Sequence, residues 1–396
     1  MNSIRSYLAL LCAVSLSLGA RGDADYRKIH FDALVVDTHN DVAQRILGGE
    51  DISSRTGHGH SDLPRLAEGG VDLQLFSIWV PPEKTSRGYF DQAVEQLDSI
   101  EGLARRNPGR LALAPDAAGV DSIVAAGKIA GMFGLEGGHH IGDDISKLDY
   151  FYGRGVRYMT LTWNNSTGWA TSASDETDPE KKLPHRGLTD SGRAIVRKMN
   201  DIGMLVDVSH VGEQTFRDVM ETTRKPVIAS HSSVWTIAPH RRNLRDWQLR
   251  ALKENGGVVF INFAPWFIDS TFGRKEDVMR RRNKARIDSI QSRIAGDEFL
   301  KDFYSAEQLT AEYDTIRPTL KQVLDHFEYV IRLIGADHVG IGSDFDGITV
   351  APAGLEDVTR FPELTKGLLE RGYSEGDVRK ILGGNFMRVL RAAEKK

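Results

Sequence analysis

Cysteine is almost absent from this chain. Of its 396 residues only Cys12 carries a thiol, so no internal disulfide can form. The residues before it, Ala9-Leu10-Leu11, lack the small residue expected just before a lipid-modified cysteine. The fold must therefore be stabilised by its hydrophobic core and by any metals that it binds.

An excess of one charge and a long hydrophobic run are also missing. The 51 Lys and Arg residues nearly balance 55 Asp and Glu residues, and the formal net charge is −4. The N-terminal apolar run, Tyr7–Leu18, is shorter than the roughly 20 residues of a membrane span. The C-terminal residues 391–396 are charged and offer no hydrophobic tail for a lipid anchor. We therefore expect neither a nucleic-acid partner nor a stable membrane anchor.

Residues 1–20 have the pattern of a secretory signal peptide. Arg5 gives a basic start, Tyr7–Leu18 gives a short apolar middle, and small residues follow. Cleavage is expected after Ala20 or Ala24. The pattern predicts an exported protein, periplasmic or secreted, whose mature part spans residues 25–396.

Eight short apolar runs of β type then alternate with helix-like stretches. Several runs are almost wholly apolar, as expected for parallel strands that are buried on both faces. Ser191–Ile202 is predicted to be a helix, with Thr189 or Asp190 at its start and Gly203 at its end. Eight strands that alternate with helices favour a single α/β domain, a (β/α)8 TIM-like barrel. The runs are Leu34–Val36, Leu73–Val80, Ile129–Leu135, Arg157–Leu161, Met204–Val208, Val227–Ala229, Val258–Phe263 and His338–Gly342.

The segment 269–318 interrupts this alternation between the seventh and eighth expected strands. It is long, charged and helix-like. Connections that follow barrel strands emerge on the face where active sites are built. Two interpretations stay open: a solvated helical excursion, or a cap that narrows a substrate pocket.

Residues that bind metals recur at the carboxyl ends of the expected strands. Because these ends converge on one mouth of a barrel, the side chains are expected to meet there. Three carboxylates and three histidines at one rim would be strongly destabilised without cations, so the pattern predicts a metal site. The six residues are His39 and Asp41 after the first strand, Glu136 after the third, His210 after the fifth, His231 after the sixth and Asp344 after the eighth.

The mixture of imidazole and carboxylate suits zinc, although manganese, cobalt or iron would also fit. His39 and Asp41 lie two residues apart on an extended segment, so both side chains point the same way and can hold one ion. His210 and His231 can hold a second ion, with Glu136 as a bridge. We therefore expect two Zn²⁺ per chain, which would share and activate one hydroxide.

Asp344 is then available for proton transfer. It can take a proton from the activated water and deliver it to a leaving amine. The alternative is that Asp344 serves as a further metal ligand or orients one of the other ligands.

These motifs, taken in order, resemble the membrane (renal) dipeptidase family of the amidohydrolase superfamily. The likeness covers nearly all of residues 25–396, and the ordered set is far more specific than any single motif. It is carried by His39-x-Asp41, Ser61-Asp62-Leu63-Pro64, Glu136-Gly137-Gly138-His139, Tyr158-Met159-Thr160-Leu161-Thr162, Val208-Ser209-His210, Ser230-His231-Ser232-Ser233, Arg241-Arg242-Asn243, Gly342-Ser343-Asp344-Phe345-Asp346-Gly347, Leu355-Glu356-Asp357-Val358 and the region of Asn385.

The resemblance implies a barrel of the metal-dependent hydrolase type that cleaves dipeptides. It implies Asp344 as the general acid/base and Glu136 as a bridge between the two metals. The implied metal ligands are His39, Asp41, Glu136, His210 and His231. It also implies that Arg242 binds the free C-terminal carboxylate of the substrate, which a guanidinium can grip with two hydrogen bonds. Acceptance of C-terminal D-residues and a homodimer are further implications.

One position departs from the family pattern. Members of the TLTH type carry a histidine after the Thr-Leu-Thr strand, where this chain has Trp163. An indole N–H donates a hydrogen bond but cannot accept a proton. Stabilisation of the substrate oxygen is then expected from the metals, from Asn164, or from His139 or His140, and substrate contacts are expected at Trp163, Asn164 and His139.

Two other functions remain as alternatives. The first is a related amidohydrolase that acts on N-acyl amino acids, lactams or cell-wall fragments. The second is a non-catalytic zinc-binding protein of the exported compartment, although storage of zinc does not need a positioned acid/base such as Asp344.

Overall fold

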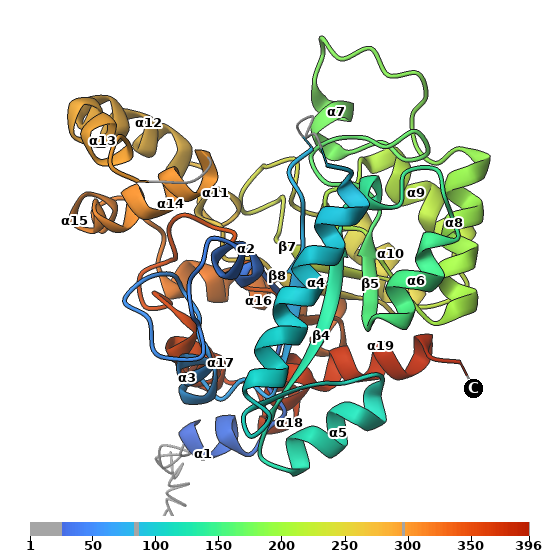
Figure 1. Cartoon of the computed structure of the whole chain (residues 1–396), viewed down its shortest axis with the longest axis horizontal. Helices are drawn as coiled ribbons and strands as arrows, with labels where there is room; N and C mark the ends of the chain where they lie inside the picture. The colour runs from blue at the N-terminus through green and yellow to red at the C-terminus, as the bar shows by residue number, and fades with distance from the viewer. Residues whose placement is uncertain (1–25, 83–86, 295–297, 396) are drawn as a thin grey trace, which may run out of the picture.

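Residues 26–82, 87–294 and 298–395 are described by the computed structural model (Figure 1). The expected signal peptide, residues 1–20, lies outside these ranges. Among the described helices, none combines the length and the apolar character that crossing a lipid bilayer requires.

Eight parallel strands form a closed barrel. Each strand pairs with its two neighbours in the ring, and the last strand pairs with the first. The predicted (β/α)8 barrel is therefore confirmed. The strands, in their order around the ring, are β1 (Val36–Asn40), β2 (Leu73–Ile78), β4 (Ile129–Glu136), β5 (Val156–Thr160), β6 (Leu205–Asp207), β7 (Ile228–Ser232), β8 (Val258–Ile261) and β9 (Val339–Ile341).

Several details of the strands differ from the sequence prediction. Strand β7 continues to Ser232, beyond the expected Val227–Ala229, so His231 lies within the strand. A ninth strand, β3 (Leu111–Leu113), pairs with the first half of β4 outside the ring; its three residues are too short a signal to recognise. The first barrel strand begins at Val36 and continues to Asn40, so His39 lies within the strand instead of after it. Polar residues in β1 hid this extension, because they are buried at the barrel mouth rather than in the apolar part of the core.

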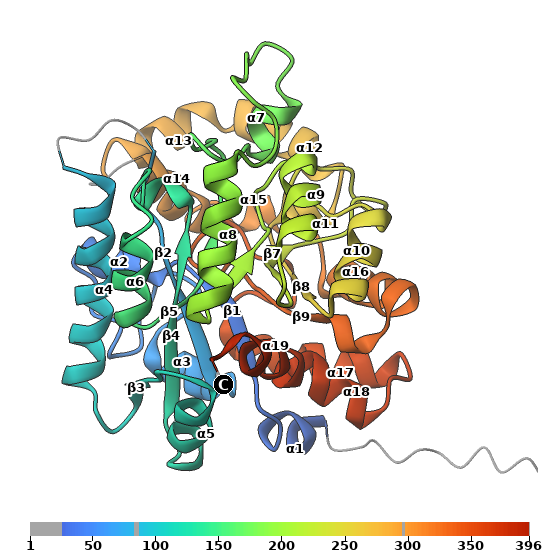
Figure 2. The same ribbon diagram turned by 90° about the vertical axis from the view of Figure 1, so that its right-hand side faces the viewer.

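Helices cover the outside of the barrel, as Figures 1 and 2 show. Amphipathic helices follow most strands and pack their apolar sides on the barrel. They are α2 (Val42–Leu47), α3 (Leu63–Glu68), α4 (Tyr89–Arg106), α5 (Ala117–Ala125), α6 (Lys147–Gly153), α8 (Asp190–Ile202), α9 (Glu213–Thr222), α10 (Asp246–Asn255) and α16 (Leu320–Ile334). The predicted helix that ends at Gly203 is α8, which is capped by the Thr189 side chain. Two short helices lie elsewhere: α1 (Tyr26–Phe31) packs against α17 (Phe361–Glu370) below the barrel, and α7 (Ala173–Thr177) lies at the top of the molecule (Figure 1).

Alternation along the strands decides which side chains reach the barrel interior. In β4, Ala130 and Met132 belong to the inner hydrophobic cluster, whereas Phe133 and Leu135 pack outward against helices. The same period of two places Glu136 on the inner side. Inner positions are thus apolar in the lower part of the barrel and become polar at the carboxyl ends of the strands.

The C-terminal helices close the opposite end of the barrel. Phe386 and Leu390 of α19 (Asn385–Ala393) belong to the inner hydrophobic cluster, and Phe386 packs edge-on against Phe260 of β8. The two preceding helices are α17 (Phe361–Glu370) and α18 (Glu375–Arg379). Figure 2 shows these three helices below the barrel, on the side away from α7.

The excursion between β8 and β9 is helical and has a small core of its own. Phe272, Ile287, Leu309 and Tyr313 pack together there. Figure 1 shows the excursion projecting at the upper left, and Figure 2 shows it along the top of the molecule. Helix α11 (Pro265–Ile268) precedes the segment 269–318, and the helices of that segment are α12 (Phe272–Arg282), α13 (Lys284–Gln291), α14 (Glu298–Glu307) and α15 (Thr310–Tyr313).

Two glycine-to-alanine substitutions test how tightly the C-terminal segment packs against the lower end of the barrel. A Cβ on Gly383 would lie 2.3 Å from the Leu34 carbonyl oxygen, whereas a Cβ on Gly376 of α18 would meet nothing closer than 3.8 Å. We predict that Gly383→Ala lowers the free energy of unfolding by about 1–3 kcal/mol because the backbone must shift. Gly376→Ala is the control and should change it by less than about 1 kcal/mol. Equal urea-unfolding midpoints for the two variants would contradict this account.

Candidate metal centre and substrate cavity

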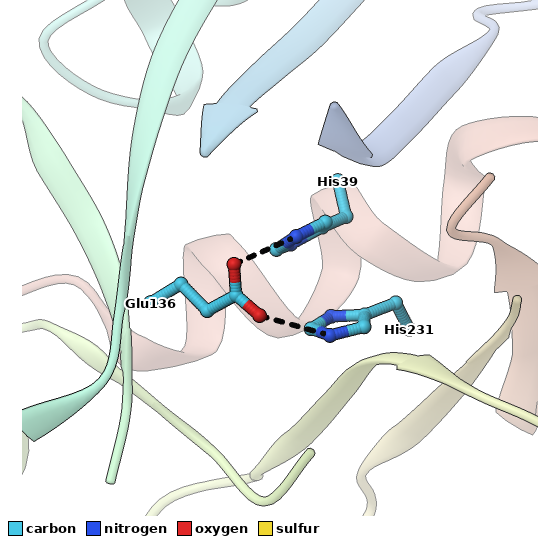
Figure 3. A group of neighbouring side chains, drawn as sticks. All are labelled: His39, Glu136 and His231. Carbon is cyan, nitrogen blue, oxygen red and sulfur yellow. Dashed lines mark ion pairs between the residues drawn. The ribbon is translucent and has the colours of Figure 1, made fainter. Parts of the chain in front are cut away.

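All six predicted metal-site residues meet at the mouth of the barrel. They come from the carboxyl ends of five different strands. Figure 3 shows three of these residues, His39, Glu136 and His231. His39 lies in β1 and Asp41 follows it, Glu136 ends β4, His231 lies in β7, and His210 and Asp344 lie three residues beyond β6 and β9. Segments far apart in the sequence therefore build one site.

Glu136 lies at the centre of this group. Its Oε2 is 3.3 Å from Nε2 of His39, while its Oε1 is 3.0 Å from Nε2 of His210 and 3.5 Å from Nε2 of His231 (Figure 3). The Asp41 carboxylate lies 3.4 Å from Nε2 of His39. The two oxygens of Glu136 thus face two different sets of ligand atoms, as a bridging carboxylate would.

Hydrogen bonds on the far side of His39 fix its orientation. The Tyr158 hydroxyl donates to the Thr38 carbonyl at 2.9 Å, so its oxygen accepts the Nδ1–H of His39, also at 2.9 Å. The Nε2 lone pair of His39 then points into the cluster. Metal-binding histidines are commonly oriented in this way through their second nitrogen.

The other two histidines are oriented by the same kind of relay. The Ser230 hydroxyl donates to Asp207 at 2.6 Å and so accepts the Nδ1–H of His231 at 2.8 Å. The Asn164 side-chain oxygen accepts the Nδ1–H of His210 at 3.1 Å. Both Nε2 atoms are left as lone pairs, 3.0 Å from each other.

This arrangement fits bound cations. The Nε2 atom of His39 is buried and has no hydrogen-bond partner among the described residues, which is costly unless something else binds it. Two groups have ligand atoms within 4.8 Å of one another: His39 with Glu136 and His231, and His39 with Asp41 and Asp344. Neutral imidazoles and carboxylates in such proximity form a suitable donor set for divalent metals.

The electrostatics of the cluster favour the same interpretation. Burial and the nearby Arg242 guanidinium lower the pKa of His210 to about 3, so His210 is neutral and its lone pair is available. Burial opposes a charge on His39, but Tyr158, Glu136 and Asp41 outweigh it and raise the pKa of His39 well above its usual range. The carboxylates thus attract positive charge to this point, which a bound cation can supply in place of a proton.

Asp344 has a distinct environment. Burial, together with Asp41 and Glu136, raises the pKa of Asp344 to about 8 against the opposing effects of His39 and Asn262. The Asn262 side-chain NH₂ donates to Oδ2 of Asp344 at 2.8 Å. The Oδ1 atom of Asp344, which is 3.9 Å from Nε2 of His39, faces the cluster. A carboxyl held this way can exchange a proton with a group bound at the cluster.

Strained backbone marks the site. His210, Asp344 and Asp346 have φ values of 65°, 63° and 63°, and no other described non-glycine residue has a positive φ in the left-handed region. Such conformations persist only when their surroundings hold them. Asp346 is held by a buried ion pair with Arg45 at 3.0 Å and by the His60 backbone N–H at 2.7 Å, so this pair fixes the loop that carries Asp344.

These supporting residues were not predicted from the sequence. Tyr158 occupies an inner position in the middle of β5, and Asp207 and Asn262 lie at the carboxyl ends of β6 and β8. Their polar side chains in otherwise apolar runs were the available signal. Arg45 and Asp346 offered no comparable signal, because their ion pair joins residues 301 positions apart.

A cavity of about 200 Å³ lies next to the cluster. Trp79 and Trp163 pack against each other with ring centroids 5.0 Å apart on one side. Trp266 and Phe267 of α11 and Phe299 of α14 contribute to its wall. Of the segment 269–318, Phe299 thus reaches the cavity, which supports the cap interpretation, while Trp266 and Phe267 lie just before that segment.

Arg242 also lines this cavity. It is buried, and it donates to the His231 carbonyl at 3.0 Å and to the Ser232 hydroxyl at 3.3 Å. Its Nε has no hydrogen-bond partner, and among the described residues it has no carboxylate partner. A buried guanidinium with a free donor edge is suited to bind a carboxylate from a ligand.

The other predicted substrate contacts have different outcomes. Trp163 and Asn164 line the cavity, and Asn164 in addition holds His210. His139 is not among the lining residues of this cavity; its Nε2 lies 3.0 Å from the Val80 carbonyl oxygen, and its ring packs against His140. The geometry therefore does not support His139 as a substrate contact, because its side chain turns toward β2 and the segment after it.

Comparisons with known proteins find relatives among dipeptidases. A family model described as membrane dipeptidase (peptidase family M19) matches residues 24–396. The dipeptidase tcpJ of Claviceps purpurea (strain 20.1) is 33% identical over 344 residues, which cover 85% of this chain and 70% of that protein.

Solved structures give the same result. A metallo peptidase from Rhodobacter sphaeroides, liganded with a phosphinate mimic of the dipeptide L-Ala-D-Ala, has a TM-score of 0.73 and 27% identity, covering 91% of this chain and 99% of that one. A protein described as the probable dipeptidase PvdM from Pseudomonas aeruginosa has a TM-score of 0.76 and 25% identity, covering 93% and 97% of the two chains.

The relay behind His39 can be tested directly. Tyr158→Phe removes the oxygen that accepts the Nδ1–H of His39, so we predict metal affinity about 10–100-fold weaker with the fold intact. Competition with a chromogenic chelator measures this. Tyr329→Phe is the matched control, because its hydroxyl bonds Asp246 outside the site. Unchanged affinity in Tyr158→Phe would show that the relay does not support the metal site.

Proposed function

Because this chain belongs to the membrane dipeptidase family and is thus a metal-dependent dipeptidase, we propose that it uses two zinc ions to hydrolyse dipeptides with a free C-terminal carboxylate. The observation that carries the proposal is the placement of Glu136, whose two oxygens face different histidines. His39, Asp41 and Glu136 would hold one ion. His210, His231 and Glu136 would hold the other.

The ions supply one part of the chemistry. When bound, a pair of zinc ions lowers the pKa of a shared water and polarises the scissile carbonyl. Every other task falls to side chains of the protein.

Arg242 orients the substrate. Its buried Nε, which has no hydrogen-bond partner among the described residues, would donate to the ligand carboxylate, and burial would make that ion pair stronger than it would be in water. A substrate must therefore end one residue beyond the scissile bond, which restricts the activity to dipeptides. Burial lowers the pKa of Arg242 to about 10, so the guanidinium stays charged at neutral pH.

Asp344 moves the proton. Asn262 holds its Oδ2, so Oδ1 of the ionised carboxylate, the form that bound cations nearby would favour, accepts the proton released by the attacking water. The same oxygen then delivers that proton to the amide nitrogen as the peptide bond breaks. The strained backbone at Asp344 keeps this oxygen at the cluster throughout.

We include C-terminal D-residues among the substrates. The support is the Rhodobacter sphaeroides metallo peptidase, whose ligand mimics L-Ala-D-Ala. We also propose that the protein is exported, on the pattern of residues 1–20. The homodimer stays a prediction from the family resemblance.

Replacement of Asp344 separates proton transfer from metal binding. We predict that Asp344→Asn loses about 10²–10⁴-fold in kcat and keeps two zinc ions per chain, because the amide cannot accept the proton. Asp98→Asn on α4 is the exposed control. Turnover and metal content by elemental analysis are the measurements. Loss of a zinc ion would instead make Asp344 a ligand, and full activity would remove it from the mechanism.

Replacement of Arg242 tests carboxylate recognition. We predict that Arg242→Gln lowers kcat/KM for Ala-Ala about 10–100-fold, since one charge-assisted contact is lost. The same variant should act on Ala-Ala amide as the native protein does, because this substrate has no terminal carboxylate. Arg250→Gln on α10 serves as control. Equal losses on both substrates would contradict the proposed role.

The substrate class itself is tested by a paired screen. The zinc-loaded protein should hydrolyse Ala-Ala and leave N-acetyl-alanine intact, and a chelator should abolish the activity. Faster cleavage of N-acyl amino acids than of dipeptides would favour the alternative amidohydrolase.

A further inference from the structure

A second cavity adjoins the first across two shared side chains. Its volume is about 360 Å³, and His210 and Arg242 line both cavities. The second cavity is built by the segment from α7 to Arg186 and by the segment Trp235–Arg245, which connects β7 to α10. Figure 1 shows α7 at the top of the molecule, with α9 below it. This cavity plays no part in the mechanism proposed above.

Basic side chains dominate the lining of this second cavity. It contains four arginines, Arg186, Arg241, Arg242 and Arg245, against two glutamates, Glu176 and Glu213. Arg245 is neutralised by its ion pair with Glu213, and its guanidinium lies 4.1 Å from the centroid of the Trp235 ring. The remaining charged side chains of the lining are three arginines and one carboxylate, that of Glu176.

Glu176 does not neutralise these arginines. Its carboxylate accepts hydrogen bonds from the Thr171 hydroxyl and, at 3.2 Å, from the Gln214 backbone N–H. Arg186 contacts only the backbone oxygen of Glu176, at 3.3 Å. Within the described part of the chain, neither Arg186 nor Arg241 has a carboxylate partner. The cavity therefore carries unbalanced positive charge in a protein whose net charge is negative.

Arg242 links this charge to the substrate site. It is buried, and its unpartnered Nε is the donor that we assign to the C-terminal carboxylate of the substrate. A residue bound there lies at the boundary of the two cavities. Its side chain can lie against Trp266 and Phe267 in the first cavity or extend into the second. An apolar side chain gains from the aromatic wall, whereas an anionic one gains from the free arginines.

We propose that the second cavity binds the anionic side chain of the C-terminal residue, so that the preferred substrates are dipeptides ending in glutamate or aspartate. The proposal rests on the proposed function, because it uses the same orientation on Arg242. Arg186 and Arg241 are its specificity-determining residues. Arg186 and Arg241 are exposed. Ion pairs at exposed sites are modest, so the preference is a discrimination of about fivefold and not an absolute requirement.

Ala-Glu and Ala-Gln form the matched pair for the test. They have nearly the same shape and differ in one charge, so the ratio of their kcat/KM values isolates the electrostatic contribution. At low salt we expect a ratio of about five for the zinc-loaded protein. The ratio should fall toward one as salt shortens the screening length. A ratio of one or less at low salt would overturn the proposal.

Variants of the two arginines locate the effect. The double variant Arg186→Gln/Arg241→Gln should bring the ratio to about one, and Arg241→Glu should favour Ala-Gln over Ala-Glu. Arg250→Gln, which changes an arginine outside both cavities, should keep the ratio of the native protein. An unchanged ratio in the double variant would contradict the assignment to this cavity.

Ala-Ala separates this result from a failure of the proposed function. If the native protein cleaves Ala-Ala but shows no preference for Ala-Glu, only the present inference is wrong. If it cleaves none of the three dipeptides, the proposed function is wrong. Urea-unfolding midpoints confirm that each variant is folded, and Arg241→Glu keeps the test decisive should the double variant unfold.

Discussion

The carboxylate of Glu136 between three imidazoles is the interaction on which the rest of the site depends. It is buried, and its oxygens lie 3.0 and 3.3 Å from Nε2 of His210 and His39, whose lone pairs would face it when neither a proton nor a cation lies between them. Lone pairs and carboxylate oxygens at such distances repel one another in a medium of low dielectric constant. Bound cations would convert this repulsion into attraction. The close approach of the ligand atoms to Glu136 is therefore itself the reason that the site needs metal.

The barrel makes such an unfavourable cluster sustainable. Its lower part is a packed apolar core, closed by α19. Its upper rim supplies buried groups that orient the site: Tyr158 for His39, Asp207 through Ser230 for His231, and Asn262 for Asp344. The strain stored at His210 and Asp344 is held by the same surroundings. Stability and function are thus divided between the two ends of the barrel, as is general for this fold. Arg186 and Arg241, beside Arg242, add a further division of tasks. In the proposal above they select the side chain of the C-terminal substrate residue and take no part in the chemistry.

The sequence predicted the parts of the structure that rest on local patterns. Apolar runs located all eight barrel strands, and the position of each ligand relative to its run predicted the cluster, because strand ends converge in a closed barrel. The extent of β1 was underestimated, since buried polar residues resemble loop residues in a sequence. The left-handed backbone at His210, the orientation of His139 toward Val80 and the ion pair of Arg45 with Asp346 depend on long-range packing. Hydrophobic periodicity carries no information about such contacts.

The most direct test of the central claim is anomalous X-ray diffraction at the zinc edge from crystals of the zinc-loaded protein. The account predicts two anomalous peaks, both in contact with Glu136, one beside His39 and Asp41 and the other beside His210 and His231. A single peak, or two peaks of which only one contacts Glu136, would contradict it.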